Sequence, residues 1–493
     1  METLGFLAAG FGVALDPTNL ALALAGCLIG TVVGALPGLG PVNGVAVLIP
    51  LAFTLGLAPE SALILLCCVY YGCMYGGRIS SIMLNIPGDE PAMMTCLDGH
   101  PMAKAGRAPE ALAISAVASF VGAVLATLGL VVLAPLLVQV AIRFGPVEYF
   151  ALYVLAFATI GGVVGANPAK TLMAAGLGLA LSCVGLDPTS GEPRFTFGLF
   201  ELYDGFDPIV AIVGLFAISE VLLLLETRPE ARAAVLRVGR AFARMADVRA
   251  ASGAMLRGSG VGFVAGVLPG AGASLGSFLA YVLEKRVSDR GTFGKGDPRG
   301  VAAPEAGNNA AAGGALIPML ALGVPGSGTT AVLLALLISL NITPGPLLFQ
   351  TQPDVVWGLV AALLIANVVL LALNLPLVGL FTRLLSIPLW ALMPFVVMVS
   401  FVGVYSINRS PFDLWVMVGF GVLGYLLRKL DVPLVPVVLG LLLGAEMEQS
   451  FRRALSISGG DPSILWGSPI ALGLYAATVL LLGVATALAL RRR

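Results

Sequence analysis

Long apolar segments, interrupted by short stretches rich in glycine, proline and polar residues, make up most of the chain. Clear apolar runs cover residues 111–140, 208–225, 355–375 and 470–490. Because about 20 apolar residues in a helix cross the hydrocarbon of a bilayer, each run predicts a membrane helix. Over the whole chain the pattern predicts an all-α polytopic membrane protein with about 12 spanning or half-spanning units.

Composition supports this fold class and argues against a metal site or ATP hydrolysis. Of 493 residues, 58% are apolar and 11% are charged, whereas a soluble domain carries about 25% charged residues. The cysteines show no metal-ligand spacing, and the single histidine, His100, cannot form a metal site alone. The sequence contains no G-x4-G-K-[ST] phosphate loop, so we do not expect ATP hydrolysis or a cofactor.

One interrupted segment occurs twice. Residues 30–44 (GTVVGALPGLGPVNG) and 262–276 (GFVAGVLPGAGASLG) share the pattern G-x3-G-x-L-P-G-x-G-x3-G. Proline and glycine break a helix, and in a membrane the broken backbone must face protein or a water-filled cavity. Paired broken segments in two halves of a chain are a sequence signal for a transporter's binding site.

A second motif also repeats in the same order. Residues 84–89 (LNIPGD) correspond to residues 322–327 (LGVPGS), and a double glycine precedes each. Each half therefore offers two broken tips. The helix that starts at a tip attracts anions with its free N–H groups, and the carbonyls of the helix that ends there attract cations. Kinked structural helices without a ligand are the alternative, which the ordered repetition of two motifs disfavours.

Charge along the chain predicts topology. Residues 227–258 hold seven arginines and two acidic residues, which predicts an amphipathic cytoplasmic surface helix. Nucleic-acid binding is an alternative for such a run, but membrane topology explains it, so no nucleic-acid partner is expected. Basic residues flank the second L-P-G segment on both sides and are absent around the first. We therefore predict re-entrant hairpins in two inverted repeats: repeat 1 over residues 1–226, a linker over 227–258, and repeat 2 with C-terminal helices over 259–493.

The tips supply the candidate site residues. Those predicted to bind substrate are Pro37, Gly38, Gly40, Asn43, Arg78, Asn85, Pro87, Gly88, Pro269, Gly270, Gly272, Ser274, Pro325, Gly326, Ser327 and Thr329. Those predicted to bind a coupling ion, Na⁺ or H⁺, are Asn85, Asp89, Glu305, Asn308 and Asn309. No other metal is expected.

Two of these charged residues have structural alternatives. Arg78 is the first basic residue of the chain; it pairs either with a substrate carboxylate or with Asp89 or Glu90. Glu305 either binds Na⁺ or a proton, or caps a helix.

Four stretches together resemble a known family. LPGLGPVNG, the segment from YGGRISSIMLNIPGDEPAMM to AVASFVG, LPGAGASLGSF and PEAGNNAAAGGALIPMLALGVPGSGTTAVLLAL are similar to the large membrane subunit of tripartite tricarboxylate transporters (TctA type). His100 stands where the family pattern has an aromatic residue. The resemblance implies a multi-pass protein of the bacterial inner membrane that imports a small carboxylate using a sodium or proton gradient. It further implies two partners, a small membrane subunit (TctB type) and a periplasmic solute-binding protein (TctC type).

Two other classes of function remain as alternatives. An intramembrane enzyme would use Asp89, Glu90, Asp98 or His100, but no nucleophile–base pair or metal spacing supports it. A passive channel for a small anion would not require two sets of closely packed glycine tips. The residues themselves therefore favour a transporter, and we do not expect an enzyme.

Overall fold

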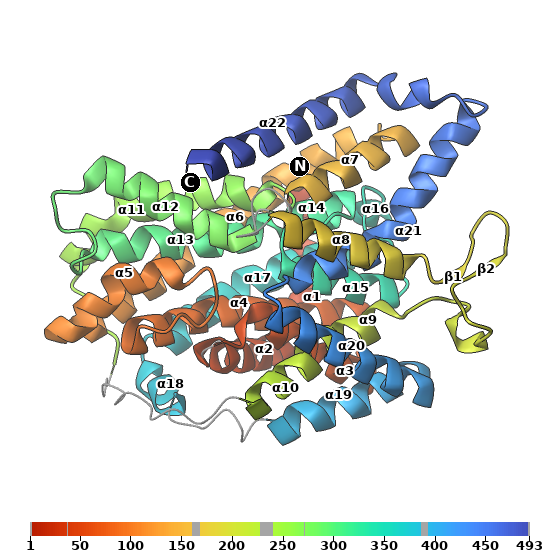
Figure 1. Ribbon diagram of the computed structural model, residues 1–493. Coiled ribbons are helices and arrows are strands. Elements are labelled where there is room, and N and C mark those ends of the chain that lie inside the picture. Colours follow the sequence, from red (N-terminus) through yellow and green to blue (C-terminus); the bar gives the residue numbers. More distant parts are fainter. Residues whose placement is uncertain are drawn as a thin grey trace.

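A computed structural model describes residues 2–36, 38–159, 168–226, 240–270, 272–385 and 393–491. Most of these residues are helical, as expected for an all-α membrane protein (Figure 1). The first half contains α1 Glu2–Ala14, α2 Pro17–Ala35, α3 Gly40–Thr54, α4 Pro59–Leu84, α5 Met93–Met102, η1 Ala103–Arg107, α6 Ala108–Ala141, α7 Pro146–Thr159, α8 Pro168–Ser182, β1 Gly185–Leu186, β2 Pro193–Arg194, η3 Phe200–Leu202, α9 Pro208–Ile212, η4 Val213–Ile218 and α10 Ser219–Glu226.

The second half begins after the segment that the structure does not describe. It contains α11 Met245–Val267, α12 Gly272–Ser288, α13 Pro298–Gly314, α14 Leu316–Leu322, α15 Gly328–Ser339, α16 Leu348–Thr351, α17 Pro353–Asn374, α18 Val378–Leu384, α19 Met393–Asn408, α20 Pro411–Lys429, α21 Leu434–Ile457, η6 Pro462–Trp466 and α22 Pro469–Arg491.

Among the described residues, seven helical stretches are long and apolar enough to cross a membrane. Shorter apolar helices, such as α3 and α15, adjoin the broken tips. The predicted total of about 12 spanning or half-spanning units stays a prediction. The segment between α8 and α9 includes a small antiparallel ladder, in which Gly185 pairs with Arg194.

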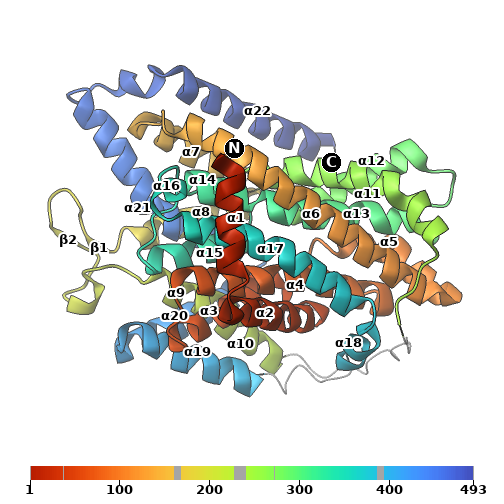
Figure 2. The same cartoon turned by 180° about the vertical axis from the view of Figure 1, so that it is seen from behind.

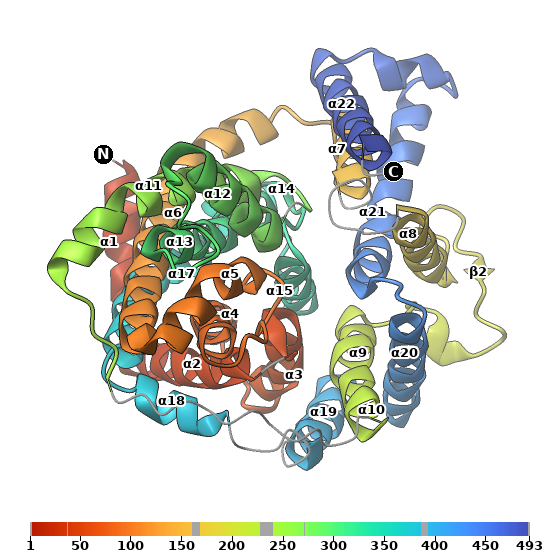
Figure 3. The same cartoon turned by 60° about the vertical axis from the view of Figure 1, so that its left-hand side comes forward.

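The helices gather into two groups (Figure 3). The core group consists of α1–α6 and α11–α18, and the arm group consists of α7–α10 and α19–α22. Seen from behind, α1 crosses in front of α17, and Phe6 of α1 stacks on Trp357 of α17 (Figure 2). Both groups contain helices from both halves of the chain.

Glycines set the packing of the core group, and they do so identically in the two halves. A Cβ at Gly30 of α2 would lie 2.3 Å from the carbonyl oxygen of Val69 in α4. A Cβ at Gly262 of α11 would lie 2.0 Å from the carbonyl oxygen of Gly307 in α13. Small residues let membrane helices approach this closely. The sequence repeat is therefore also a repeat of packing, with α2 on α4 matched by α11 on α13.

The arginine-rich segment 227–258 lies only partly within the described residues. Residues 227–239 fall outside them, and residues 240–244 are not helical, so the described part of this stretch before α11 does not form the predicted surface helix. Residues 245–258 form the first part of α11, so they are continuous with the hairpin that follows. At the base of this hairpin, Arg257 makes two 2.8 Å hydrogen bonds to the carboxylate of Glu284 on α12.

Candidate functional site

The two L-P-G segments form the turns that the sequence predicts. α2 ends at Ala35 and α3 starts at Gly40; α11 ends at Val267 and α12 starts at Gly272. Both turns use glycine at two positive φ angles, +87° and +47° at Gly38 and Gly40, +77° and +66° at Gly270 and Gly272. Residues with a Cβ rarely adopt such angles, which explains the P-G-x-G pattern. Pro37 lies outside the described residues, and Pro269 is buried.

The second pair of tips is also equivalent in backbone geometry. α4 ends in a left-handed residue, Asn85 with φ +58°, and α14 ends in Gly323 with φ +70°. Asparagine is the residue other than glycine that most readily takes this conformation at a helix end. Pro87-Gly88 and Pro325-Gly326 follow, leading into α5 and α15. Asn85 is exposed and Thr329 is buried.

The structure brings all four tips together. Within each half the tips are hydrogen bonded, from Gly38 N to Gly88 O (3.3 Å) and from Gly272 N to Gly326 O (3.1 Å). Between the halves, the Ser274 hydroxyl donates to Glu90 Oε2 at 3.3 Å. A Cβ at Gly328 would lie 3.3 Å from a Val42 methyl group, so the start of α15 contacts the start of α3.

Side chains already occupy two of the helix ends. The Ser327 hydroxyl caps α15 in a reciprocal arrangement with Thr330, and Asp89 Oδ1 accepts the N–H of Ala92 at 2.9 Å. These caps satisfy N–H groups that a helix leaves unpaired. At the start of α3, the Asn43 side chain instead contacts Glu220 and Arg428 of the arm group.

Arg78 is fully buried, and its guanidinium is held by the core group. It donates to the carbonyls of Tyr75 and Leu112, to the Ser115 hydroxyl and to Asn374 Oδ1, at 2.7 to 3.3 Å. These partners satisfy the buried charge without an acidic side chain. Its predicted role at a substrate carboxylate stays a prediction.

The candidate coupling-ion residues of α13 are also buried, near Arg78 and its partners. Glu305 accepts hydrogen bonds from Thr95 Oγ1 at 2.5 Å and Ser119 Oγ at 3.0 Å. Asn309 Nδ2 donates to the Glu305 carbonyl. Among the described residues, the side-chain oxygen and nitrogen of Asn308, Asn309 Oδ1 and Asp89 Oδ2 are buried without a hydrogen-bond partner. Buried oxygens of amides and carboxylates are suitable ligands for a hard cation.

Asp98 and His100, which the enzyme alternative requires, have structural surroundings. Asp98 Oδ1 accepts the backbone N–H groups of Gly294, Gly296 and Asp297, and Oδ2 accepts the Tyr281 hydroxyl. Asp98 thus fastens α5 of the first half to the loop before α13. His100 Nδ1 lies 3.0 Å from the Ile82 carbonyl oxygen. In the described part of the chain no group of three His, Cys, Asp or Glu side chains is placed to hold a metal.

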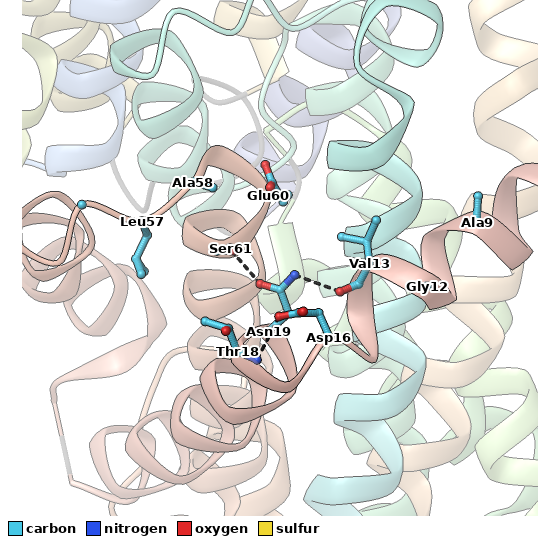
Figure 4. A pocket seen from close by; sticks show the side chains of 11 residues that line it. Ala9, Gly12, Val13, Asp16, Thr18, Asn19, Leu57, Ala58, Glu60 and Ser61 are labelled. Carbon is cyan, nitrogen blue, oxygen red and sulfur yellow. Dashed lines mark hydrogen bonds between the residues drawn. The ribbon is translucent and has the colours of Figure 1, made fainter.

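A cavity lies away from the tips, where α1, α2 and the α3–α4 connection meet (Figure 4). It measures about 640 Å³, and Asp16, Glu60 and Ser61 are among its lining residues. Asn19 braces its wall by donating to the Val13 carbonyl and accepting from the Ser61 hydroxyl. None of the predicted site residues lines it.

Sequence reasoning missed several polar partners of the site. Thr95 and Ser119 hold Glu305, and Glu220 and Arg428 hold Asn43. Each pair comes from segments far from its partner in the chain, so no local motif marks it. The one available signal was charge, since Glu220 lies within an apolar helical stretch and Arg428 lies in the last turn of another.

The fold and the site define a class, a polytopic helical membrane protein built around paired broken helices, as in secondary transporters. The sequence model described as "Tripartite tricarboxylate transporter TctA family" matches residues 20–439. The chain belongs to this family, a family of transporter subunits rather than enzymes.

Two relatives from Agrobacterium vitis are similar to the chain. The "Uncharacterized 52.8 kDa protein in TAR-I ttuC' 3'region" is 40% identical over 477 residues, covering 97% of this chain and 95% of the relative. The "Uncharacterized protein in TAR-II ttuC' 3'region" is 42% identical over 214 residues, covering 43% of this chain and 88% of the relative. No solved structure matches the chain significantly.

Proposed function

We propose that this chain imports a tricarboxylate or a related carboxylate across the bacterial inner membrane, driven by a sodium or proton gradient. The observation that carries the proposal is the convergence of four Pro-Gly tips from two equivalent halves. Helix ends at such a junction supply partial positive charge for an anion and carbonyl oxygens for a cation without many charged side chains.

The substrate and the coupling ion occupy neighbouring parts of this site. The tip backbone at Gly38, Gly88, Gly270 and Gly326, with Ser274 and Ser327, faces the carboxylate. The unpartnered oxygens of Asp89, Asn308 and Asn309, next to Glu305, supply ligands for Na⁺ or a site for H⁺. An ion bound there adds positive charge close to the anion, which couples the two binding events.

The two halves are inverted repeats, and the core group moves against the arm group to alternate access. Support comes from the charge difference between the two L-P-G flanks and from the equal packing of α2 on α4 and α11 on α13. The family also supports assembly with a small membrane subunit and a periplasmic solute-binding protein. The binding protein delivers the carboxylate to the outer side of the site.

Uptake by proteoliposomes that contain the purified chain with its two partner subunits tests this function. A carboxylate should accumulate against its gradient when Na⁺ or H⁺ is supplied outside. Equilibration without accumulation would indicate a channel, and chemical conversion of the solute would indicate an enzyme.

Variants of the tips test the site within the same assay. Pro37→Ala, Pro269→Ala and Gly326→Leu should each abolish uptake while the protein still inserts into the membrane. Normal uptake by all three would refute the tips as the site.

A further inference from the structure

Asn43 joins the core group to the arm group. It lies in the first turn of α3, directly after the first tip. Its Nδ2 donates to Glu220 Oε2 of α10 at 3.1 Å, and Arg428 of α20 donates to its Oδ1 at 3.4 Å. Among the side-chain to side-chain hydrogen bonds of the described residues, those of Asn43 are the ones that cross between the two groups.

Arg428 differs from Arg78 in a way that matters for an anion. Arg78 is completely buried and bonded through all three guanidinium nitrogens. The Arg428 side chain keeps 23% of its surface exposed, and its Glu220 partner keeps 13%. Arg428 also lies beside the positive end of α3, where the helix dipole adds to its charge.

The space at this point is small. A cavity of about 30 Å³ borders Asn43 and Glu220, and apolar residues such as Leu39 and Val221 line the rest of it. This is the volume of about one water molecule. A carboxylate does not fit there, so an anion takes the place of Glu220 on Arg428 only when Glu220 moves away from Asn43.

We propose that Arg428 binds a carboxylate group of the transported anion, in exchange for the carboxylate of Glu220. This inference rests on the proposed transport function. The incoming carboxylate forms the same charge-assisted hydrogen bonds that Glu220 forms in its absence. Glu220 keeps the arginine paired while the site is empty, which avoids the cost of an uncompensated buried charge. The exchange breaks the hydrogen bond between Asn43 and Glu220 of α10, so binding of the anion removes one of the contacts between α3 and the arm group.

Equilibrium binding to the purified full-length chain tests the role of Arg428, with citrate, succinate and acetate as probes. Arg428→Gln should weaken binding of the best of the three by roughly tenfold or more. Lys429→Gln is the matched control: it removes the neighbouring charge of α20 and its ion pair with Glu226 of α10. It should bind within about twofold of the wild type.

Variants of Glu220 separate binding from a purely structural ion pair. Glu220→Gln removes the competitor and should tighten binding. In the double variant Glu220→Gln, Arg428→Gln the charges are removed together, so a structural role predicts recovered binding, whereas our proposal predicts that binding stays weak.

Three results would overturn the inference: Arg428→Gln binding as tightly as Lys429→Gln, recovery in the double variant, or a wild type that binds none of the three probes. Uptake distinguishes it from the transport proposal. If the wild type accumulates the carboxylate but Arg428→Gln binds it as tightly as the wild type, only the inference about Arg428 is refuted. If Arg428→Gln weakens binding of the carboxylate but the wild type does not accumulate it, only the transport proposal is refuted.

Discussion

Two buried charged residues near the tips, Arg78 of α4 and Glu305 of α13, are held by uncharged partners. Arg78 and Glu305 are both fully buried, and both contact α6 one helical turn apart, through Ser115 and Ser119. Hydroxyl and amide groups thus compensate each charge, as a buried ion requires. In the proposed function, the backbone of the tips therefore faces the ligand.

The left-handed conformation of Asn85 makes a prediction about stability. A β-branched residue at φ +58° is strained, so Asn85→Val should lower the free energy of unfolding by about 1–2 kcal/mol. Asn85→Gly should be tolerated, because the equivalent residue is Gly323. Thermal unfolding in detergent measures both, and equal stability of the two variants would contradict the assignment.

The pH dependence of the loop after α8 follows from Asp187. Backbone N–H groups of Ser190 and Thr189, with Arg452 and Arg194, lower the pKa of its carboxyl from 3.8 to about 2. A lowered folded-state pKa means that the stabilisation is complete above pH 3.8 and is lost as pH falls towards 2. Asp187→Asn should therefore be less stable than the wild type at neutral pH, and the difference should shrink between pH 4 and pH 2. A difference that does not change with pH would contradict this.

Pairs of helices, rather than isolated helices, are the repeated elements of this protein. In the arm group, α8 packs on α21 and η4 packs on α20, again through glycines. A Cβ at Gly178 would lie 2.1 Å from the Val437 carbonyl oxygen, and one at Gly214 would lie 2.4 Å from the Met417 carbonyl oxygen. Each pair takes one helix from each half of the chain, so the two halves are interlocked.

Two glycines of α11 test the packing. A Cβ at Gly262 would meet Gly307 at 2.0 Å, whereas one at Gly260 would meet nothing within 4 Å. Gly262→Ala should lower the free energy of unfolding by about 1–3 kcal/mol, and Gly260→Ala should be neutral or slightly stabilising. Thermal unfolding again provides the measurement, and equal effects would argue against close packing of α11 on α13.

The sequence was sufficient to predict what depends on local pattern. The apolar runs predicted helices, and the repeated L-P-G motif predicted two equivalent broken segments, which the structure shows as turns with positive φ at glycine. The contacts of Arg78 with Asn374 and of Asn43 with Arg428 join residues that are 296 and 385 positions apart. Such pairings depend on how the helices pack, so one sequence without its fold does not contain a signal for them.

At the scale of the whole molecule, the core group and the arm group meet near the tips. The core group carries the four tips, and its α3 contacts the arm group through α19 and η4. Movement of one group against the other would expose the tips to each side of the membrane in turn. This requires the two halves to cross the membrane in opposite directions.

Cysteine labelling from each side of the membrane tests that requirement most directly. Single cysteines at Asp16 and Glu60 flank the first L-P-G hairpin, and those at Arg257 and Lys285 flank the second. In oriented cells, a membrane-impermeant maleimide should label the first pair from outside, and the second pair only after the inner face is opened. Labelling of the Asp16 and Arg257 positions from the same side would contradict the inverted arrangement and the alternating-access site built on it.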